Sequence, residues 1–476
     1  MNLISDKDEV QNDFRNHLAT ADKQGHRRWL FPKKVSGKWF LRRTHVSWVL
    51  LAVMFIGPFI KINGNPLLML NIVERRFSIL GQIFWPQDVA IFAVAMLLFL
   101  TGIVVFTTAF GRLWCGWTCP QTVLMEMVFR KIEYAIEGDS DAQQKLHAAP
   151  WNHEKILKKG FKQSVFFILS FIIANWLLSY IIGMDALKTI ITDDPRRHVS
   201  GLVSIVVFTI IFYLIFARFR EQACTFICPY GRFQSAMLDE NSMIVAYDYK
   251  RGEGRGRLQR AQTRDNRKAE GLGDCVSCRQ CVSVCPTGID IRNGLQMECV
   301  NCTACIDACD KVMAKLGWER GLIRYASLDS IERGTPFKFT ARMAGYAAVL
   351  AALVTLFCVL LFTRSAVDCT LLRAPGGLFQ ESADGKISNL YTVKVINKSR
   401  RDLPLTFRLE DGAPGKLQVM GAGEFVAPKE NLTQTSILIL LDRAALTDGK
   451  AKIKVGVYAG EKRIETLKTS FIGPRN

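Results

Sequence analysis

Long apolar runs alternate with charged segments along the chain. Five of these runs are long enough to cross about 30 Å of hydrocarbon as helices. Their approximate bounds are Val46–Ile60, Val89–Phe110, Ser164–Gly183, Leu202–Ala217 and Ala341–Phe362. A charged segment precedes the first run and no small-residue cleavage site follows it, so we expect a retained anchor and not a signal peptide. The pattern predicts a multi-span α-helical membrane protein.

Lys and Arg are distributed unevenly over the segments that connect these runs. They crowd the segment before the first run, the loop after the second and the loop after the fourth. The alternate loops carry only Lys61, Arg75 and Arg76 in one case, and Lys188, Arg196 and Arg197 in the other. Because cytosolic loops collect basic residues, the N-terminus and the long central segment are expected in the cytosol. Everything after Phe362 is then expected outside, in the periplasm.

The net charge of +19 is explained by the same excess of Lys and Arg in the loops expected in the cytosol. No base-stacking or groove-reading motif accompanies this charge, so we expect no nucleic-acid partner. Membrane lipid is the expected partner of the basic loops. The glycine-rich basic stretch from Lys250 to Gly273 is expected to be a flexible cytosolic linker near anionic lipid head groups.

The pattern changes to an alternation of apolar and polar residues from about Leu371 onward. This alternation predicts strands at Tyr391–Asn397, Pro404–Leu409, Gln434–Leu441 and Ala451–Tyr458. Several short strands within about a hundred residues predict a C-terminal all-β, immunoglobulin-like sandwich. Its expected role is recognition or docking outside the membrane, with a purely structural cap as the alternative.

The central segment contains a repeated cysteine motif. Cys275, Cys278, Cys281 and Cys285 precede Pro286, and Cys299, Cys302, Cys305 and Cys309 repeat the spacing before Asp310. In two-cluster ferredoxins, the last cysteine of each such motif binds the other cluster. We therefore predict one [4Fe–4S] cluster on Cys275, Cys278, Cys281 and Cys309, and a second on Cys299, Cys302, Cys305 and Cys285. Disulfides are disfavoured in a cytosolic segment, and zinc usually takes two pairs of ligands with a longer gap.

A second cysteine motif, C-x-x-x-C-P, follows two of the apolar runs. Cys115 and Cys119 precede Pro120, and Cys224 and Cys228 precede Pro229, which indicates an internal duplication. Each proline suits the first turn of a helix, so Cys119 and Cys228 are expected at helix N-termini, where the dipole favours a thiolate. Three interpretations stay open: packing cysteines, redox dithiols, or a metal site for iron–sulfur or copper. Arg112 and Arg232 flank the motifs and could either favour thiolates or contact lipid head groups.

Together these patterns divide the chain into five parts. Residues 1–43 form a cytosolic N-terminal segment, and 44–240 form a four-helix membrane domain with both C-x-x-x-C-P motifs. Residues 241–340 form a cytosolic ferredoxin-like domain with two clusters, and 341–363 form the fifth transmembrane helix. Residues 364–476 form a periplasmic immunoglobulin-like sandwich.

The order of these features resembles the CcoG family, also called FixG or RdxA. The resemblance covers nearly the whole chain and includes both C-x-x-x-C-P motifs, the doubled ferredoxin motif, the last span and the immunoglobulin-like tail. It implies a multi-pass protein of the bacterial inner membrane that helps to assemble a cbb-type cytochrome c oxidase. Its implied partners are copper ion and the assembly factors of that oxidase. It also implies a cupric reductase activity, with Cys115, Cys119, Cys224 and Cys228 as the residues that bind or reduce the metal.

Two other functions stay open beside copper reduction. The chain could be a quinol-oxidising subunit that feeds a partner reductase, or a non-enzymatic assembly scaffold whose clusters are structural or sensory. Copper(II) needs one electron, and copper(I) prefers soft thiolate ligands, which makes the implied reaction chemically reasonable. The electron donor, the oligomeric state and the partner of the C-terminal domain leave no motif in the sequence.

Overall fold

The computed structural model describes residues 18–474, apart from 22–23, 25, 63, 73–75, 260–261, 382–384, 411–414 and 422–424. The chain divides into two compact units. The first consists of Met1–Gly81 and Val89–Phe357, and the second of Gln82–Asp88 and Cys358–Asn476.

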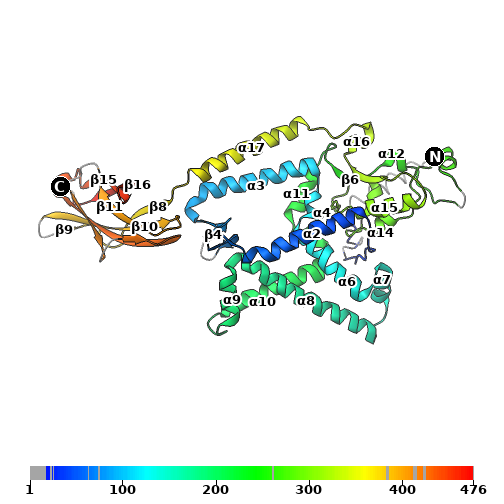
Figure 1. The fold of residues 1–476 in the computed structure, drawn as a ribbon, viewed down its shortest axis with the longest axis horizontal. Helices are drawn as coiled ribbons and strands as arrows, with labels where there is room; N and C mark the ends of the chain where they lie inside the picture. Colours follow the sequence, from blue (N-terminus) through cyan, green and yellow to red (C-terminus); the bar gives the residue numbers. More distant parts are fainter. Residues whose placement is uncertain are drawn as a thin grey trace. The chain divides into compact units, whose positions relative to one another are not determined.

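Within the described residues, five helical segments are long and apolar enough to cross a membrane. Their helices are α2 (Lys38–Ile56), α3 (Val89–Phe110), α8 (His153–Ile182), α10 (Val199–Leu214) and α17 (Ala341–Phe362) (Figure 1). The predicted number of spans is confirmed, but α2 and α8 begin earlier than the apolar runs. Hydropathy detects only the apolar part, whereas backbone hydrogen bonding continues through the preceding basic turns. The side chain of Asn152 sets the start of α8 by accepting a hydrogen bond from the Lys155 amide at 2.9 Å.

Shorter elements connect these helices. The short helices are α4 (Leu113–Trp117), α5 (Pro120–Leu124), α6 (Arg130–Glu137), α7 (Ser140–Ala148), α9 (Met184–Thr192), α11 (Pro229–Met237), α12 (Tyr249–Gly252), α13 (Arg264–Ala269), α14 (Gln280–Ser283), α15 (Ala304–Lys315) and α16 (Leu328–Arg333). Between α2 and α3 lie β1 (Lys61–Ile62), β2 (Asn65–Pro66), β3 (Leu68–Asn71), β4 (Arg76–Ile79) and β5 (Gln82–Phe84). Strand β1 pairs with β2, and β3 pairs with β4, both antiparallel.

A buried aromatic cluster joins the membrane helices of the first unit. The ring of Phe129 stacks on that of Phe216 with centroids 4.4 Å apart, and it meets Phe166 of α8 edge-on at 4.9 Å. Leu51 of α2 and Ile173 of α8 complete the cluster. Phe129 lies in a π-helical turn that follows the first C-x-x-x-C-P motif, and Phe216 lies in one that precedes the second, so segments beside both motifs pack against each other.

Buried charges lie beside this apolar cluster. Arg220 donates to both carboxylate oxygens of Glu133, at 2.9 and 2.7 Å. Lys162 of α8 lies 3.3 Å from Glu133 and 2.9 Å from Glu137. Burial alone would raise the pKa of Glu133, but the neighbouring charges of Arg220, Lys162 and Arg130 hold it well below its ordinary value. These ion pairs fix α6 and α8 to the segment that leads into the second C-x-x-x-C-P motif.

The segment with the doubled cysteine motif folds around a two-stranded sheet and one longer helix. Strand β6 (Ile244–Tyr247) pairs antiparallel with β7 (Ile323–Ala326). Apolar side chains of both strands pack with Ile306 and Met313 of α15 and with several of the cysteines. The cysteine loops therefore lie on a small dry core.

The basic stretch before the first cysteine motif is folded, so the predicted flexible linker is wrong over its described residues. Arg251 and Arg264 both pair with Asp274 at 2.6 Å. Arg267 is 1% exposed and donates to the carbonyl oxygen of Gly273 at 3.0 Å. These guanidinium groups bind buried carbonyl and carboxylate oxygens, and a local reading of composition does not show such partners.

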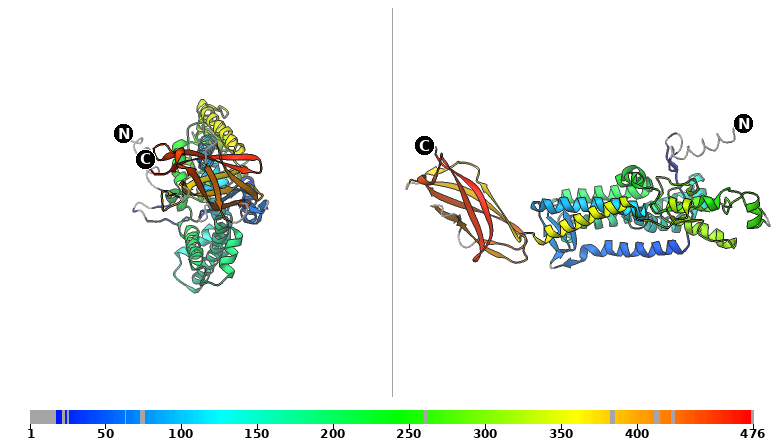
Figure 2. Two further views of the ribbon diagram at one scale, coloured as in Figure 1. Left: turned by 90° about the vertical axis from the view of Figure 1, so that its left-hand side faces the viewer. Right: turned by 90° about the horizontal axis from the view of Figure 1, so that it is seen from above.

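The second unit contains the predicted β-sandwich. Its strands are β8 (Val367–Arg373), β9 (Gln380–Glu381), β10 (Lys386–Asn397), β11 (Leu403–Leu409), β12 (Gly415–Met420), β13 (Phe425–Ala427), β14 (Asn431–Asp442), β15 (Lys450–Ala459) and β16 (Lys462–Ile472). One sheet has the order β12-β14-β10-β8, with β9 paired to β10, and the other has the order β13-β11-β15-β16. The two sheets form facing layers (Figure 2). Each of the four predicted strands is present and is longer than its apolar pattern.

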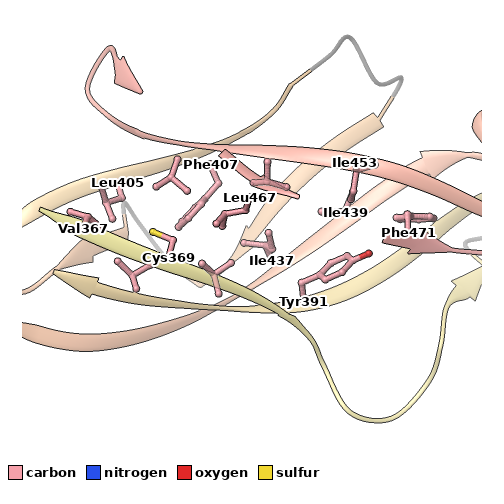
Figure 3. Close-up of a cluster of buried hydrophobic side chains, with 14 of the residues drawn as sticks. Val367, Cys369, Tyr391, Leu405, Phe407, Ile437, Ile439, Ile453, Leu467 and Phe471 are labelled. Atoms are coloured by element: carbon pink, nitrogen blue, oxygen red, sulfur yellow. The ribbon is translucent and has the colours of Figure 1, made fainter. Parts of the chain in front are cut away.

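Apolar side chains fill the space between these sheets. Tyr391, Ile437, Ile439 and Phe471 are fully buried there (Figure 3). Cys369 of β8 belongs to the same core, so its thiol is a packing group of the sandwich. Such alternation of inward and outward residues is what a two-layer β structure requires.

Candidate functional site

The two ferredoxin motifs share an unusual backbone geometry. Ser277 and Arg279 in the first loop have φ values of 50° and 55°, and Asn301 and Thr303 in the second have 53° and 66°. Non-glycine residues rarely adopt positive φ. The outliers occupy matching positions, one before and one after the second cysteine of each motif. Each loop thus coils tightly, so that its cysteines turn toward a common centre.

The eight cysteines of these motifs form two groups of four thiols. Cys309 interacts electrostatically with the other three members of the first group, Cys275, Cys278 and Cys281. Cys285 interacts with the three members of the second group, Cys299, Cys302 and Cys305. Each group thus takes three thiols from one motif and the fourth from the other. The arrangement matches the exchange that the spacing predicts, and the identity of the iron ligands stays a prediction.

The surroundings of these thiols fit a metal cluster. Burial raises the pKa of Cys281 and Cys299 to about 12, and that of Cys302 to about 11. A buried thiol ionises only when a cation compensates its charge, and iron supplies that compensation. The backbone amides of Asn301 and Ala304 donate to the sulfurs of Cys299 and Cys302, where they would stabilise thiolates. Cys278, by contrast, is exposed, so the first group reaches the protein surface.

The C-x-x-x-C-P cysteines lie where the two repeats meet. Cys119 is the N-cap residue of α5 and Cys228 that of α11, each followed by proline in the first turn. This confirms both predicted helix starts. Cys115 lies on α4, and Cys224 lies on the π-helical turn Ala223–Ile227.

The structure brings these four thiols together. Cys224 interacts electrostatically with Cys115, Cys119 and Cys228, and Cys115 in turn interacts with Cys119 and Cys228. Convergence from two repeats disfavours the interpretation as simple packing cysteines. Burial raises the pKa of Cys115 to about 11 and that of Cys224 to about 12. Among the described residues, no three His, Cys, Asp or Glu side chains are close enough to hold a single metal ion.

Two side chains complete the surroundings of Cys115. Its Sγ donates to Oε1 of Gln234 at 3.3 Å. The positive charge of Arg112 opposes the effect of burial on the Cys115 pKa, so this arginine favours the thiolate, as its flanking position predicts. The side chain of Arg232, which also flanks a motif, lies outside the described residues.

Arg112 also connects three cysteine-bearing loops. Its Nη1 donates to the carbonyl oxygens of Met297 and of Cys299, the latter at 3.3 Å. Its Nη2 donates to the carbonyl oxygen of Gly231, three residues after Cys228. A single buried guanidinium therefore holds both C-x-x-x-C-P motifs against the loop of the second thiol group. The sequence places Arg112 beside the first motif but gives no sign of its contacts with the ferredoxin loop.

Two glycines allow these loops to approach closely. A Cβ atom on Gly116 would lie 2.3 Å from the carbonyl oxygen of Val300, and one on Gly231 would lie 2.3 Å from that of Cys224. Both positions therefore exclude any side chain. Cys115 packs against the apolar cluster that contains Val300 and Cys302. The first C-x-x-x-C-P loop is thus in direct contact with the second ferredoxin loop.

The ferredoxin-like segment also caps the first membrane helix, which sequence reasoning missed. Oδ1 and Oδ2 of Asp307, in α15, accept hydrogen bonds from the amides of Trp39 at 3.1 Å and Phe40 at 2.7 Å. These amides are among those that the first turn of a helix leaves without partners. Beside them, Tyr325 donates to the Asn301 carbonyl oxygen at 3.1 Å. The loops that carry the ferredoxin cysteines are therefore fixed directly to the N-terminal end of α2.

Three family models match the chain. A 4Fe-4S binding domain matches residues 92–136, a 4Fe-4S dicluster domain matches 219–328, and the immunoglobulin-like fold at the C-terminus of FixG matches 357–474. The first of these ranges contains Cys115 and Cys119 as its cysteines. The iron–sulfur and immunoglobulin-like parts predicted from the sequence are confirmed.

Three related proteins align with most of the chain. Protein RdxA of Cereibacter sphaeroides is 36% identical, over 81% of this chain and 83% of its own. The nitrogen fixation protein FixG of Rhizobium meliloti is 33% identical, over 83% of this chain and 82% of its own. Protein RdxB of Cereibacter sphaeroides is 32% identical, over 88% of this chain and 90% of its own.

Proposed function

Since the chain belongs to the family of FixG and RdxA, and is a membrane iron–sulfur electron-transfer protein, we propose that it reduces copper(II) to copper(I). We propose further that the copper(I) serves the assembly of a cbb-type cytochrome c oxidase, together with assembly factors of that oxidase. On this proposal the chain lies in the bacterial inner membrane. Its N-terminus and ferredoxin-like segment face the cytosol, and its β-sandwich faces the periplasm.

One observation carries this proposal: the three thiol groups are contiguous. Cys278 of the first group is exposed, and Cys281 of the same group interacts electrostatically with Cys305 of the second. The second group in turn lies against the C-x-x-x-C-P loop through the close approach of Gly116 and Val300. The arrangement leads from the protein surface to four thiols at the ends of two membrane helices.

The two ferredoxin groups are assigned to [4Fe–4S] clusters. Cys275, Cys278, Cys281 and Cys309 would hold one, and Cys285, Cys299, Cys302 and Cys305 the other. Such clusters accept and release single electrons. The protein contributes an apolar core that excludes water from the thiols, and backbone amides that favour their ionised form.

The C-x-x-x-C-P thiols are assigned to the substrate. Each copper(II) ion takes up one electron, and the copper(I) that forms prefers the soft thiolates of Cys115, Cys119, Cys224 and Cys228. Binding releases the thiol protons, and the charge of Arg112 assists that release at Cys115. The electron donor lies outside this chain, and the exposed Cys278 is where it would reach the first thiol group.

A second candidate function, quinol oxidation, is favoured by an apolar cavity. The cavity has a volume of about 630 Å³ and lies where α2 begins and α3 ends, beside the first C-x-x-x-C-P motif. Its walls include Trp114, Trp117, Phe106 and Tyr325. A membrane-borne quinol could enter such a cavity and donate electrons, in which case copper would not be needed.

Reoxidation of the reduced protein separates these functions. The full chain, purified without air and reduced with dithionite, is mixed with copper(II) in the presence of a copper(I)-specific chelator. We expect one copper(I) per electron released. The double variant Cys115→Ser, Cys119→Ser should keep both cluster signals in electron paramagnetic resonance and lose this reaction, whereas the control Cys358→Ser should keep it. An unchanged rate in the double variant would refute the proposed role of these thiols.

A further inference from the structure

A basic cavity lies beside the second ferredoxin loop, and none of the residues assigned above to copper lines it. It has a volume of about 360 Å³ and is bounded by the segment before α2, by the first turns of α2, by α6 and by the ferredoxin loops. The charged side chains of its wall are Lys33, Lys34, Arg43, Arg130, Lys131 and Glu126. Cations therefore greatly outnumber carboxylates around this space.

Two of these cations are buried and have nitrogen atoms without partners. Arg43 is 4% exposed; its Nε donates to the Gly116 carbonyl oxygen at 2.7 Å, but its Nη2 has no hydrogen-bond acceptor among the described residues. Arg130 is 2% exposed, and its Nη2 likewise lacks a hydrogen-bond acceptor, but a carboxylate oxygen of Glu221 lies 4.0 Å away and the charges of Glu126 and Glu133 also act on this guanidinium. A buried charged donor without an acceptor is costly. Carboxylates compensate the charge of Arg130, whereas Arg43 forms no ion pair among the described residues and so indicates a missing anion.

The one carboxylate of the wall does not supply that anion. Glu126 accepts from Nε of Arg130 at 2.9 Å and forms no ion pair with Arg43 among the described residues. Lys131 has aromatic neighbours, with its Nζ 6.0 Å from the Phe40 ring centroid and 5.9 Å from that of Trp48. Such contacts neutralise an ammonium group much less than a carboxylate does.

We propose that this cavity binds a phosphate group. The guanidinium of Arg43, with lysines at the rim of the cavity, matches an anion with several oxygen atoms, and guanidinium groups bind phosphate with defined geometry. The phosphate can belong to an anionic lipid or be free in solution. The lipid source is compatible with α2, a candidate membrane span whose Leu41 and Trp48 are 57% and 62% exposed, because acyl chains could cover these side chains. This inference is independent of copper reduction.

The location gives the site a connection to the redox centre. Pro286 and Ala304 of the cavity wall are next to Cys285 and Cys305 in the sequence, and Arg43 and Glu126 both act electrostatically on Cys302. A phosphate bound here would thus lie beside the second thiol group and offset part of the positive charge that Arg43 places there.

Calorimetric titration of the full chain, purified without air in detergent and depleted of lipid, tests the proposal. Three ligands are compared: inorganic phosphate, short-chain phosphatidylglycerol and phosphatidylcholine with the same chains. We expect saturable binding of phosphate or phosphatidylglycerol. Tighter binding of phosphatidylglycerol than of both others assigns the lipid, whereas tighter binding of inorganic phosphate assigns the free anion.

Variants at the rim tie that binding to the cavity. Lys33→Gln and Lys131→Gln should each weaken it about tenfold, the effect of losing about 1.4 kcal/mol. The matched control is Lys158→Gln, at an exposed lysine that pairs with Glu154 at 2.6 Å away from the cavity. Unchanged absorption of the iron–sulfur centres would show that each variant is folded. The absence of saturable binding in the unmodified protein, or equal binding in the rim variants and the unmodified protein, would overturn the proposal.

Discussion

Arg112 donates a hydrogen bond from Nη1 to the carbonyl oxygen of Cys299 at 3.3 Å, although 187 positions separate the two residues in the sequence. The same side chain reaches Gly231 through Nη2. One buried cation therefore connects the first C-x-x-x-C-P motif, its repeat and the second ferredoxin loop. From this contact we expect electron transfer between the cysteine groups to depend on Arg112.

Replacement of Arg112 by lysine should impair transfer without removing the clusters. Lysine keeps the charge but cannot donate to several carbonyl oxygens in a planar fork. We expect Arg112→Lys to lower the rate of copper(II)-dependent reoxidation by about tenfold or more. The reason is that a hydrogen bond to a charged group contributes about 1.5–3 kcal/mol, and its loss would loosen the contact between the loops. Stopped-flow absorption of the iron–sulfur centres measures that rate. A variant as fast as the unmodified protein would show that the bridge is dispensable.

Gly116→Ala should separate the first C-x-x-x-C-P loop from the ferredoxin loop. Its Cβ would lie 2.3 Å from the Val300 carbonyl oxygen, a backbone atom that can move only with its loop. We expect slower reoxidation and a lower melting temperature. The control is Gly160→Ala in α8, where a Cβ would have no neighbour within 4 Å. That change should be neutral or should stabilise the helix by up to about 1 kcal/mol, and equal effects of the two substitutions would contradict the contact.

The exchange of the fourth ligand can be tested with paired serine variants. Cys285→Ser should eliminate the same paramagnetic signal as Cys302→Ser, and Cys309→Ser should eliminate the same signal as Cys278→Ser. Cys285→Ser would therefore behave like variants of the second motif, and Cys309→Ser like variants of the first, because each motif supplies its last cysteine to the other group. Electron paramagnetic resonance of the reduced variants shows directly which cluster signal each variant has lost. Cys358→Ser is the control. If Cys285→Ser grouped with Cys278→Ser, each motif would hold its own cluster and the assignment would fail.

Glu133 is expected to be a major contributor to the stability of the first unit. Glu133→Gln leaves Arg220 and Lys162 without their shared carboxylate, which should lower the free energy of unfolding by about 3–5 kcal/mol. The exposed pair of Glu154 and Lys158 offers a control, since Glu154→Gln should change the free energy of unfolding very little. Chemical denaturation in detergent compares the two. A loss at Glu133 no larger than that at Glu154 would contradict its structural role.

The pH dependence of this contribution follows from the lowered pKa of Glu133. Folding lowers that pKa from its ordinary value of 4.5, so the folded state binds its proton less tightly than the unfolded state does. The stabilisation is therefore complete above pH 4.5 and declines as the pH falls toward the folded pKa. The stability difference between Glu133→Gln and the unmodified protein should stay constant from pH 8 to pH 6, and should shrink only in strong acid. A difference that already shrank between pH 8 and pH 6 would contradict the assignment.

The sequence predicts the features that depend on local pattern. Apolar runs locate the membrane helices, alternation locates the sandwich strands, and the prolines after Cys119 and Cys228 locate two helix starts. The regular cysteine spacing also predicts which thiols gather, because such loops leave few ways to bring four sulfurs together.

The features that sequence reasoning missed are contacts between distant polar groups. Asp307 caps α2 and Arg112 reaches Cys299, but neither partner leaves a periodic trace in the sequence. The stretch from Lys250 to Gly273 has the composition of a linker, yet Arg251 and Arg264 meet the buried carboxylate of Asp274. Long polar side chains find their partners only when the fold is complete, so local patterns underestimate how firmly such segments are held.

The most direct test of the account is the amount of iron and acid-labile sulfide per chain in protein purified without air. Two [4Fe–4S] clusters on the eight ferredoxin cysteines predict about eight of each. A count of about twelve would place iron on Cys115, Cys119, Cys224 and Cys228 as well, and would contradict their assignment to copper. Protein that is folded and contains no iron or labile sulfide would contradict the central claim that these thiols hold electron-carrying clusters.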